Sequence, residues 1–193
     1  MKKSWRLAAL FLVTFCLTGC GEKFEPTEST IYVTEKGEVK SAVMESFEED
    51  YYDFSELTDE VEDEVRAYCL DKNEEVMTVE SLTQSDDMVT LLMNYQTVGA
   101  YVEFNETLLF NGTMQEAVKA GYIPEMLYDT EGQETVYDAE SMDGLKVIIT
   151  DENVCIQTSG KIKYVSDNAI LLDKKLAKAV ETGKSHPAFV IYK

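Results

Sequence analysis

Cysteine and histidine are the residues of this chain best suited to nucleophilic or metal chemistry. There are four cysteines and one histidine, His186, which precedes Pro187 in a polar stretch typical of an exposed loop. Nucleophilic catalysis needs a nucleophile with a base beside it, and a structural zinc site takes several His or Cys ligands. With one histidine, widely separated Cys69 and Cys155, and no Gly-x-Ser-x-Gly sequence, the chain predicts neither kind of site.

Carboxylates are abundant, with 37 Asp and Glu residues, so a pair of acids for glycoside hydrolysis is open as an alternative. No pair can be singled out, because any fold of this chain brings acids close together. Four tyrosines could stack on a sugar ring, although half-buried packing is the role that we expect for them: Tyr51, Tyr52, Tyr122 and Tyr128.

Two acidic segments invite comparison with cation sites. The segment 129–134 reads Asp-Thr-Glu-Gly-Gln-Glu, which lacks the EF-hand order of Gly at the sixth and Glu at the twelfth position. We expect an acidic turn there, and a solvated segment at 48–53. The ten glycines are scattered and form no phosphate-cradling loop. The sequence therefore predicts no bound metal and no cofactor.

The N-terminus has the pattern of an export signal. Lys2, Lys3 and Arg6 precede the run 7–17, eleven residues of which Thr14 alone is polar. This run suits a signal sequence and is shorter than the roughly 20 apolar residues that span a bilayer. An uncut N-terminal membrane anchor is the alternative interpretation.

The run ends in Leu17-Thr18-Gly19-Cys20, which resembles the lipobox of bacterial lipoproteins. The resemblance implies diacylglyceryl transfer to the Cys20 thiol and cleavage before Cys20, on the extracytoplasmic face of the cell membrane. Two acyl chains anchor a protein stably, at about 0.8 kcal/mol per buried CH₂. We expect a signal peptide at 1–19, a lipidated cysteine and flexible tether at 20–30, and one globular domain at 31–193.

The net charge of the processed chain limits the classes of partner that it can bind. Removal of 19 residues from 193 leaves 174, with 14 basic residues against 37 acids and a net charge of −23. This charge excludes nucleic acid, repels anionic lipid headgroups, and favours a basic protein or envelope component. The segment 45–87 has 17 acids and two basic residues, whereas 160–193 has seven lysines and three acids. The two segments either face each other in the fold or mark opposite poles.

After processing, Cys69 and Cys155 are the cysteines outside the anchor. Export permits a disulfide between them. Their apolar surroundings, with Cys155 between Val154 and Ile156, favour two buried thiols instead. Both alternatives are open.

Residue patterns predict the first half of the fold. Alternation predicts hairpins at 31–35 with 38–47 and at 76–83 with 88–95. Apolar spacing predicts the main helix at about 55–72, with Ser55 as the N-cap, and a capping box at Thr113 and Glu116 opens a short helix at about 114–120. The segment 98–104 fits a helix or a strand, and 107–110 fits a strand.

The second half looks loop-like at 128–144 and then rich in strands. Strands are predicted at 145–150, 154–158, 161–165, 169–172 and 188–192, arranged as a C-terminal antiparallel meander, with 176–180 open between strand and helix. Hairpins and helices without regular alternation indicate an α+β fold with an antiparallel sheet.

Beyond the signal, the chain loosely resembles small acidic lipoproteins of Gram-positive bacteria that have no assigned role, through Gly160–Lys175 and the final Phe-Val-Ile-Tyr-Lys. The resemblance implies no catalytic residues. We therefore expect a membrane-anchored, non-enzymatic binding module. An envelope hydrolase using carboxylates and a small solute-binding accessory of a transporter are the alternatives.

Overall fold

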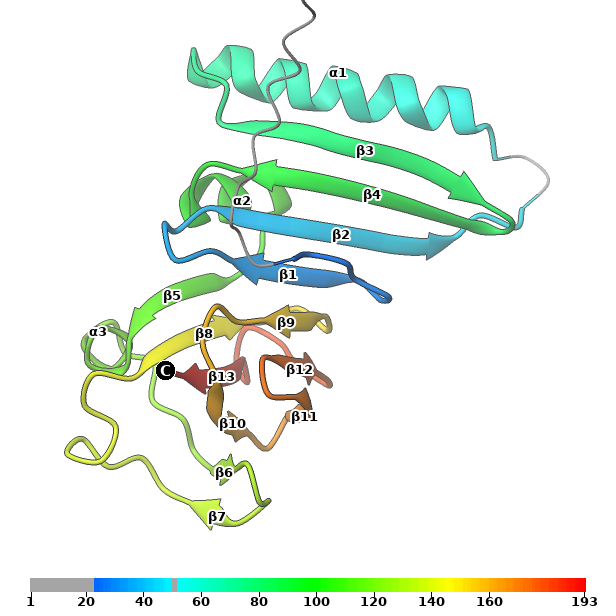
Figure 1. Cartoon of the computed structure of the whole chain (residues 1–193). Coiled ribbons are helices and arrows are strands. Elements are labelled where there is room, and N and C mark those ends of the chain that lie inside the picture. The colour runs from blue at the N-terminus through cyan, green and yellow to red at the C-terminus, as the bar shows by residue number, and fades with distance from the viewer. Residues whose placement is uncertain (1–22, 50–51) are drawn as a thin grey trace, which may run out of the picture.

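The structure, a computed structural model, describes residues 23–49 and 52–193. The signal sequence, Cys20 and Tyr51 lie outside the described residues. The predicted α+β class is confirmed: two sheets of mostly antiparallel strands are accompanied by one long helix and two short ones (Figure 1). None of the helices in the described part is long and apolar enough to cross a membrane.

The larger sheet has seven strands in the order β11-β12-β9-β1-β2-β4-β3. All neighbours in it are antiparallel except β1 and β9, which run parallel. Its strands are β1 (Thr30–Val33), β2 (Val39–Ser46), β3 (Met77–Ser85), β4 (Met88–Tyr95), β9 (Cys155–Gln157), β11 (Ala169–Asp173) and β12 (Leu176–Ala179).

The smaller sheet has six antiparallel strands in the order β5-β8-β13-β10-β6-β7. They are β5 (Leu109–Thr113), β6 (Leu127–Asp129), β7 (Glu134–Thr135), β8 (Lys146–Thr150), β10 (Ile162–Ser166) and β13 (Ala188–Tyr192). One hydrophobic cluster draws residues from both sheets, including Ile31 and Val33 with Ile148 and Val190. A second cluster lies on the other face of β13, where Phe189 and Ile191 pack with Met114 and Ala117.

Both predicted hairpins are confirmed. β1 pairs with β2, and Gly37 in their turn has a φ of 83°, which a glycine adopts without strain. β3 pairs with β4 up to Ser85 and Met88, so the turn is tighter than the sequence suggested.

The main helix is confirmed as α1 (Phe54–Lys72), but its predicted N-cap is wrong. Asp53 caps the helix, since its Oδ1 accepts hydrogen bonds from the backbone N of Ser55 at 2.7 Å and of Glu56 at 3.2 Å. A carboxylate at this end also complements the positive end of the helix dipole.

The structure also shows the conformation of two segments that fitted either a helix or a strand, and of one predicted capping motif. The segment 98–104 is helical, as α2 (Val98–Asn105), and 176–180 holds strand β12. The capping box is confirmed: Thr113 and Glu116 exchange side-chain to backbone hydrogen bonds at the start of α3 (Met114–Lys119).

The C-terminal strands exist as predicted, but they do not form a meander. Along the chain β8 joins the smaller sheet, β9 the larger, β10 the smaller, β11 and β12 the larger, and β13 the smaller. Of the successive strands from β8 onward, β11 and β12 alone pair with each other. The physical reason is visible in β8, where Val147 to Thr150 are buried on both faces, which requires the central position it takes between β5 and β13.

The segment expected to be a flexible tether makes specific contacts where it is described. Phe24 stacks on Tyr32 with ring centroids 6.1 Å apart, and Gln157 Nε2 donates to the carbonyl oxygen of Lys23 at 3.2 Å. Glu28 and Lys178 form an ion pair. The chain is therefore held against β1, β9 and β12 from Lys23 onward.

Candidate binding groove

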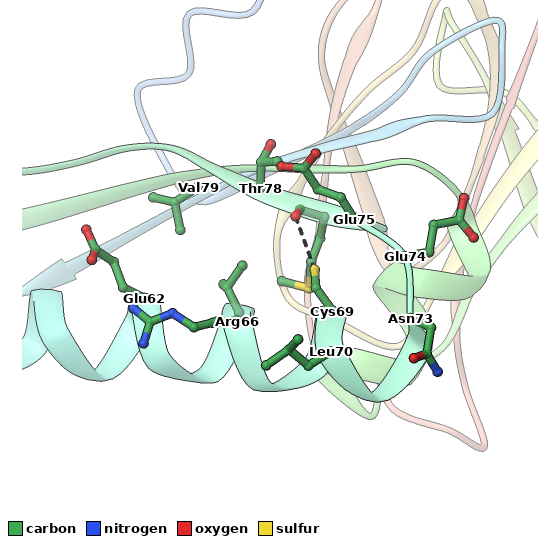
Figure 2. Close-up of a pocket in the computed structure, with 11 residues that line it drawn as sticks. Glu62, Arg66, Cys69, Leu70, Asn73, Glu74, Glu75, Thr78 and Val79 are labelled. Carbon is green, nitrogen blue, oxygen red and sulfur yellow. Dashed lines mark hydrogen bonds between the residues drawn. The ribbon is translucent and has the colours of Figure 1, made fainter.

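An open groove of about 810 Å³ lies between α1 and β3 (Figure 2). β3 is the outermost strand of the larger sheet, and α1 runs alongside it (Figure 1). The groove is lined by Glu62, Val65, Arg66, Cys69, Leu70, Asn73, Glu74, Glu75, Met77, Thr78 and Val79.

The groove exists because α1 packs loosely against the larger sheet. No residue of α1 is buried, and its apolar stripe is half-buried throughout. Near the C-terminal end, Val65, Tyr68 and Cys69 touch the hydrophobic cluster between the sheets. Leu70 lies outside that stripe and is 70% exposed, and it borders the groove.

The floor of the groove is apolar. Met77 is 1% exposed, and Val65 and Val79 flank it from the helix and the strand. The Cys69 thiol donates a long hydrogen bond to the Met77 carbonyl oxygen, with Sγ 3.5 Å from the oxygen. This contact joins the helix to the beginning of β3.

The turn that ends α1 brings acidic residues to the rim. Asn73 adopts a left-handed conformation with φ of 54°, and its backbone N donates to Leu70 O at 3.1 Å. Asparagine tolerates this conformation better than most residues. The chain then reverses through Glu74 and Glu75 directly into β3, so both carboxylates border the groove.

The charge of the rim is negative because nearby cations are already paired. Arg66 binds Asp63 at 2.7 Å, and Lys72 binds Glu103 at 2.5 Å while lying over the Tyr68 ring. Lys72 and Tyr68 both donate to Glu103 and lower its pKa. Within the described residues, Glu62, Glu74 and Glu75 form no ion pair, so their field acts on whatever enters the groove.

The outer edge of β3 lies beside this groove. β3 pairs with β4 alone, and a register shift between Val79 and Ser81 makes Glu80 an extra residue in the edge strand. Such bulges interrupt pairing and are a common protection of exposed edges. The bulge divides the edge into two regular stretches, 77–79 and 81–85, and the first of them lines the groove.

The ionisable side chains of the lining are three carboxylates, one guanidinium and the Cys69 thiol. Within residues 23–49 and 52–193, no group of three or more His, Cys, Asp or Glu side chains is placed to hold a metal ion. An apolar floor with a charged rim and a free strand edge can hold an extended peptide.

The two cysteines singled out from the sequence lie on different elements, and both are free. Cys69 borders the groove, whereas Cys155 is buried in β9, where burial raises the pKa of its thiol.

His186 is half-exposed in a loop, with Nε2 3.5 Å from Asp167 Oδ1. It borders a separate cavity of about 270 Å³ together with Tyr122 and Phe189. The buried hydroxyl nearby, Ser166, donates to Asn168 Oδ1 at 2.6 Å and so is not directed at the histidine.

The remaining sequence candidates have local packing roles. Tyr52 stacks on Phe47 at 4.8 Å, and Tyr122 packs on Phe110 at 5.6 Å. The Tyr128 hydroxyl lies 3.0 Å from the sulfur of Met126. In the segment 129–134, the Asp129 carboxylate accepts bonds from the backbone N of Glu131 and Gln133, which makes it the acidic turn that we expected.

Sequence reasoning missed two features. Leu70 carried a signal, namely a large apolar residue outside the helical stripe next to Cys69. Glu152 was missed as well: its carboxylate accepts a hydrogen bond from Tyr101, and burial raises its pKa. The sequence feature that could have identified Glu152 is the pair Asp151-Glu152 between two apolar strands.

Comparison with protein-family models, with curated proteins and with solved structures found no match to this chain.

Proposed function

We propose that this chain is a lipid-anchored, extracytoplasmic binding module that holds an extended, basic segment of another protein in the groove between α1 and β3. The observation that carries the proposal is the combination of an apolar floor, a free strand edge and unpaired rim carboxylates in one open groove.

The anchor rests on the sequence. A basic start, an eleven-residue apolar run and Leu-Thr-Gly-Cys lead to lipidation at Cys20. Mass spectrometry of the purified native protein tests it. A diacylated N-terminal Cys20 supports the anchor, and an intact Met1 contradicts it.

The shape of the groove favours an extended segment over a small solute. The groove is open, and β3 has no strand partner on its outer side over 77–79, where the Met77 carbonyl oxygen accepts from Cys69. A peptide that adds to a strand edge gains affinity from main-chain hydrogen bonds and specificity from pockets for alternate side chains. Val65, Met77 and Val79 would receive the apolar side chains.

The charge of the groove favours a basic partner. Glu62, Glu74 and Glu75 border it, while Arg66 is directed to Asp63. Complementary charge raises the rate of association and disfavours acidic partners. Alternating apolar and basic residues in the bound segment would satisfy both the floor and the rim.

A photo-crosslinking amino acid at position 70 tests the site in intact cells. Leu70 projects beside the groove, so the proposal expects a discrete crosslinked protein at this position. Val136 provides the matched control, since its 67% exposure equals that of Leu70 within a few per cent and it lies outside the groove.

Identification of the crosslinked peptide completes the test. The proposal expects a segment containing Lys or Arg among aliphatic residues. A synthetic copy of that peptide should bind the wild-type protein at least about tenfold more tightly than the Leu70→Lys variant, because a groove contact is lost and the added cation repels a basic segment. Val136→Lys, which makes the same change in charge outside the groove, should bind the peptide as the wild-type protein does. Equal crosslinking at positions 70 and 136, or equal binding by the two variants, contradicts the groove as the site.

A further inference from the structure

A second charged surface lies at the other end of the larger sheet. We call Lys161, Lys163, Lys174 and Lys193 the basic pole. Backbone hydrogen bonds gather these residues: Lys161 N donates to Lys193 O at 2.8 Å, and Ile162 N donates to Lys174 O at 2.8 Å. The lysines come from three separate segments of the chain, so the sequence alone does not show that they meet.

The basic pole has an apolar component. Lys161, Lys163 and Lys174 border a groove of about 420 Å³ together with Leu171 and Leu172, and Asp173 is the one acid in its lining. Leu172 is 47% exposed, and Ile170 in the same strand is 52% exposed. Exposed aliphatic side chains surrounded by lysines are typical of surfaces that rest on membranes.

The charges of the basic pole are not used within the fold. In the part of the chain that the structure describes, Lys161, Lys163 and Lys174 form no ion pair. Lys72 and Lys178 differ in this respect, since Lys72 binds Glu103 and Lys178 binds Glu28. Three exposed ammonium groups are thus free for an anionic surface.

The start of the described chain lies beside the basic pole. Gln157 holds Lys23 by the hydrogen bond to its carbonyl oxygen, and Gln157 is opposite Leu176 in the pairing of β9 with β12. Thr158 N donates to Lys175 O at 2.9 Å, which places the Lys174–Lys175 turn next to the same site. Cys20 precedes Lys23 by three residues, which can span at most about 11 Å.

The acidic end of the molecule is far enough away to leave the basic pole independent. β12 and β3 are separated by five strand spacings in the larger sheet, about 24 Å at about 4.8 Å each. The Debye length is about 8 Å at physiological ionic strength, so exposed carboxylates on α1 are screened at that distance. The net charge of the chain predicts repulsion from anionic headgroups, but the local charge at the basic pole has the opposite sign.

We propose that the basic pole binds the phosphates of anionic phospholipid headgroups in the membrane that holds Cys20, with Leu172 against the interface. This inference rests on the lipid anchor of the proposed function. It turns α1 and the groove away from the membrane, because they lie at the opposite end of the larger sheet (Figure 1). The anchored domain then has one preferred orientation, with its binding groove open to partners.

Lysine footprinting of the native lipoprotein tests the proposal. The protein is reconstituted into vesicles of phosphatidylcholine alone or with added phosphatidylglycerol, and a water-soluble acylating reagent is applied. Lys161, Lys163 and Lys174 should react at least about fivefold more slowly on the anionic vesicles, since one lysine near an anionic surface contributes about that factor. Lys184, which lies beyond the opposite end of β13, should react at the same rate on both.

A charge-matched pair of variants sharpens the test. Lys174→Glu should restore the reactivity of Lys161 and Lys163 on anionic vesicles, and Lys184→Glu, with the same change in net charge, should not. High salt should also abolish the protection in the wild-type protein.

The outcomes separate this inference from the proposed function. If the lipidated protein floats with both kinds of vesicle but its lysines react equally on both, the lipid-binding role of the basic pole is wrong and the anchor is unaffected. An unmodified Cys20 in a protein that does not float overturns the anchor and this inference together. Protection in intact cells without protection on anionic vesicles assigns the basic pole to another envelope component and also overturns the lipid assignment.

Discussion

The Tyr101 hydroxyl donates a hydrogen bond to the Glu152 carboxylate across 51 residues of sequence, with the two oxygens 2.8 Å apart. Tyr101 is a buried residue of α2, and Glu152 lies where the chain crosses from β8 in the smaller sheet to β9 in the larger one. The neighbouring Asp151 accepts bonds from the Thr107 hydroxyl at 2.6 Å and from Leu108 N at 2.8 Å. This polar cluster fixes the crossing between the sheets against α2.

Replacement of Tyr101 by Phe tests the importance of that bond. The change removes a donor from a partly buried carboxylate and should lower the free energy of unfolding by about 1 to 3 kcal/mol at pH 7. Burial raises the pKa of Glu152, and the bond from Tyr101 opposes that rise. The difference in free energy of unfolding between the wild-type protein and Tyr101→Phe should therefore shrink as pH falls and Glu152 becomes protonated. Urea denaturation at several pH values from neutral to acid measures it.

The sign of the pH effect follows from linkage. A carboxyl whose pKa is higher in the folded state binds its proton first there, so protonation of Glu152 adds stability as pH falls through its folded pKa. The gain ends once the unfolded chain binds the same proton. Tyr68→Phe is the control, since Tyr68 donates to the exposed Glu103 at 3.1 Å and its loss should matter less. A loss for Tyr101→Phe that grows in acid contradicts this account.

The start of α1 gives a second prediction. Asp53→Ala should reduce the free energy of unfolding by about 1 kcal/mol, because two backbone N–H groups lose their acceptor. Ser55→Ala, which removes the residue predicted as N-cap from the sequence, should have little effect, because Ser55 donates its backbone N–H to the cap. Chemical denaturation of both variants distinguishes them. A larger effect from Ser55→Ala would show that the helix begins elsewhere.

Local patterns predicted the elements well, for a physical reason. The alternation at 31–47 and the stripe at Leu57, Val61 and Val65 reflect which side of one element is covered. The Thr113 and Glu116 pair lies within a single helical turn, so its geometry is encoded locally. These predictions needed no knowledge of the rest of the chain.

Pairing between distant strands could not be read in the same way. The turns at 151–153 and 166–168 look like hairpin turns, but side-chain bonds from Thr182 to Asn153 and from Asn168 to the His186 carbonyl hold them as crossings between sheets. Those partners are distant in sequence. The groove and the basic pole depend on the same long-range pairing. The acidic segment forms α1 and β3 at one end of the larger sheet, and the basic segment forms β11 and β12 at its other end together with β10 and β13 of the smaller sheet.

Thiol reactivity gives a third prediction and tests the alternative of a disulfide. Cys69 borders the open groove, whereas Cys155 is 2% exposed and its thiol pKa is raised by burial. The native protein should therefore show one fast-reacting thiol and one that reacts only after unfolding. A maleimide reagent followed by peptide mass spectrometry should place the fast reaction at Cys69, and Cys69→Ser should remove it. Two protected thiols that appear after reduction would indicate a bond between the cysteines.

The last prediction concerns the close approach of Gly160 to the end of the described chain. A Cβ atom at Gly160 would lie 2.5 Å from the backbone carbon and oxygen of Lys193. Lys193 cannot move freely, because its N–H donates to Lys161 O at 3.0 Å while its own oxygen accepts from Lys161 N. The absence of a side chain at Gly160 is therefore what lets β10 and β13 meet at the basic pole.

Gly160→Ala should consequently lower the free energy of unfolding by about 1 to 3 kcal/mol, the usual range for a forced backbone shift in a packed region. Gly183→Ala is the matched control, since a Cβ there meets nothing within 4 Å, and it should be close to neutral. The Gly160 variant should also expose the amides of Lys161 and Lys193 to faster hydrogen exchange while the centre of β13 stays protected. Equal stability of the two alanine variants would mean that the strand ends separate without cost, and the basic pole would then lose the backbone contacts that gather its lysines.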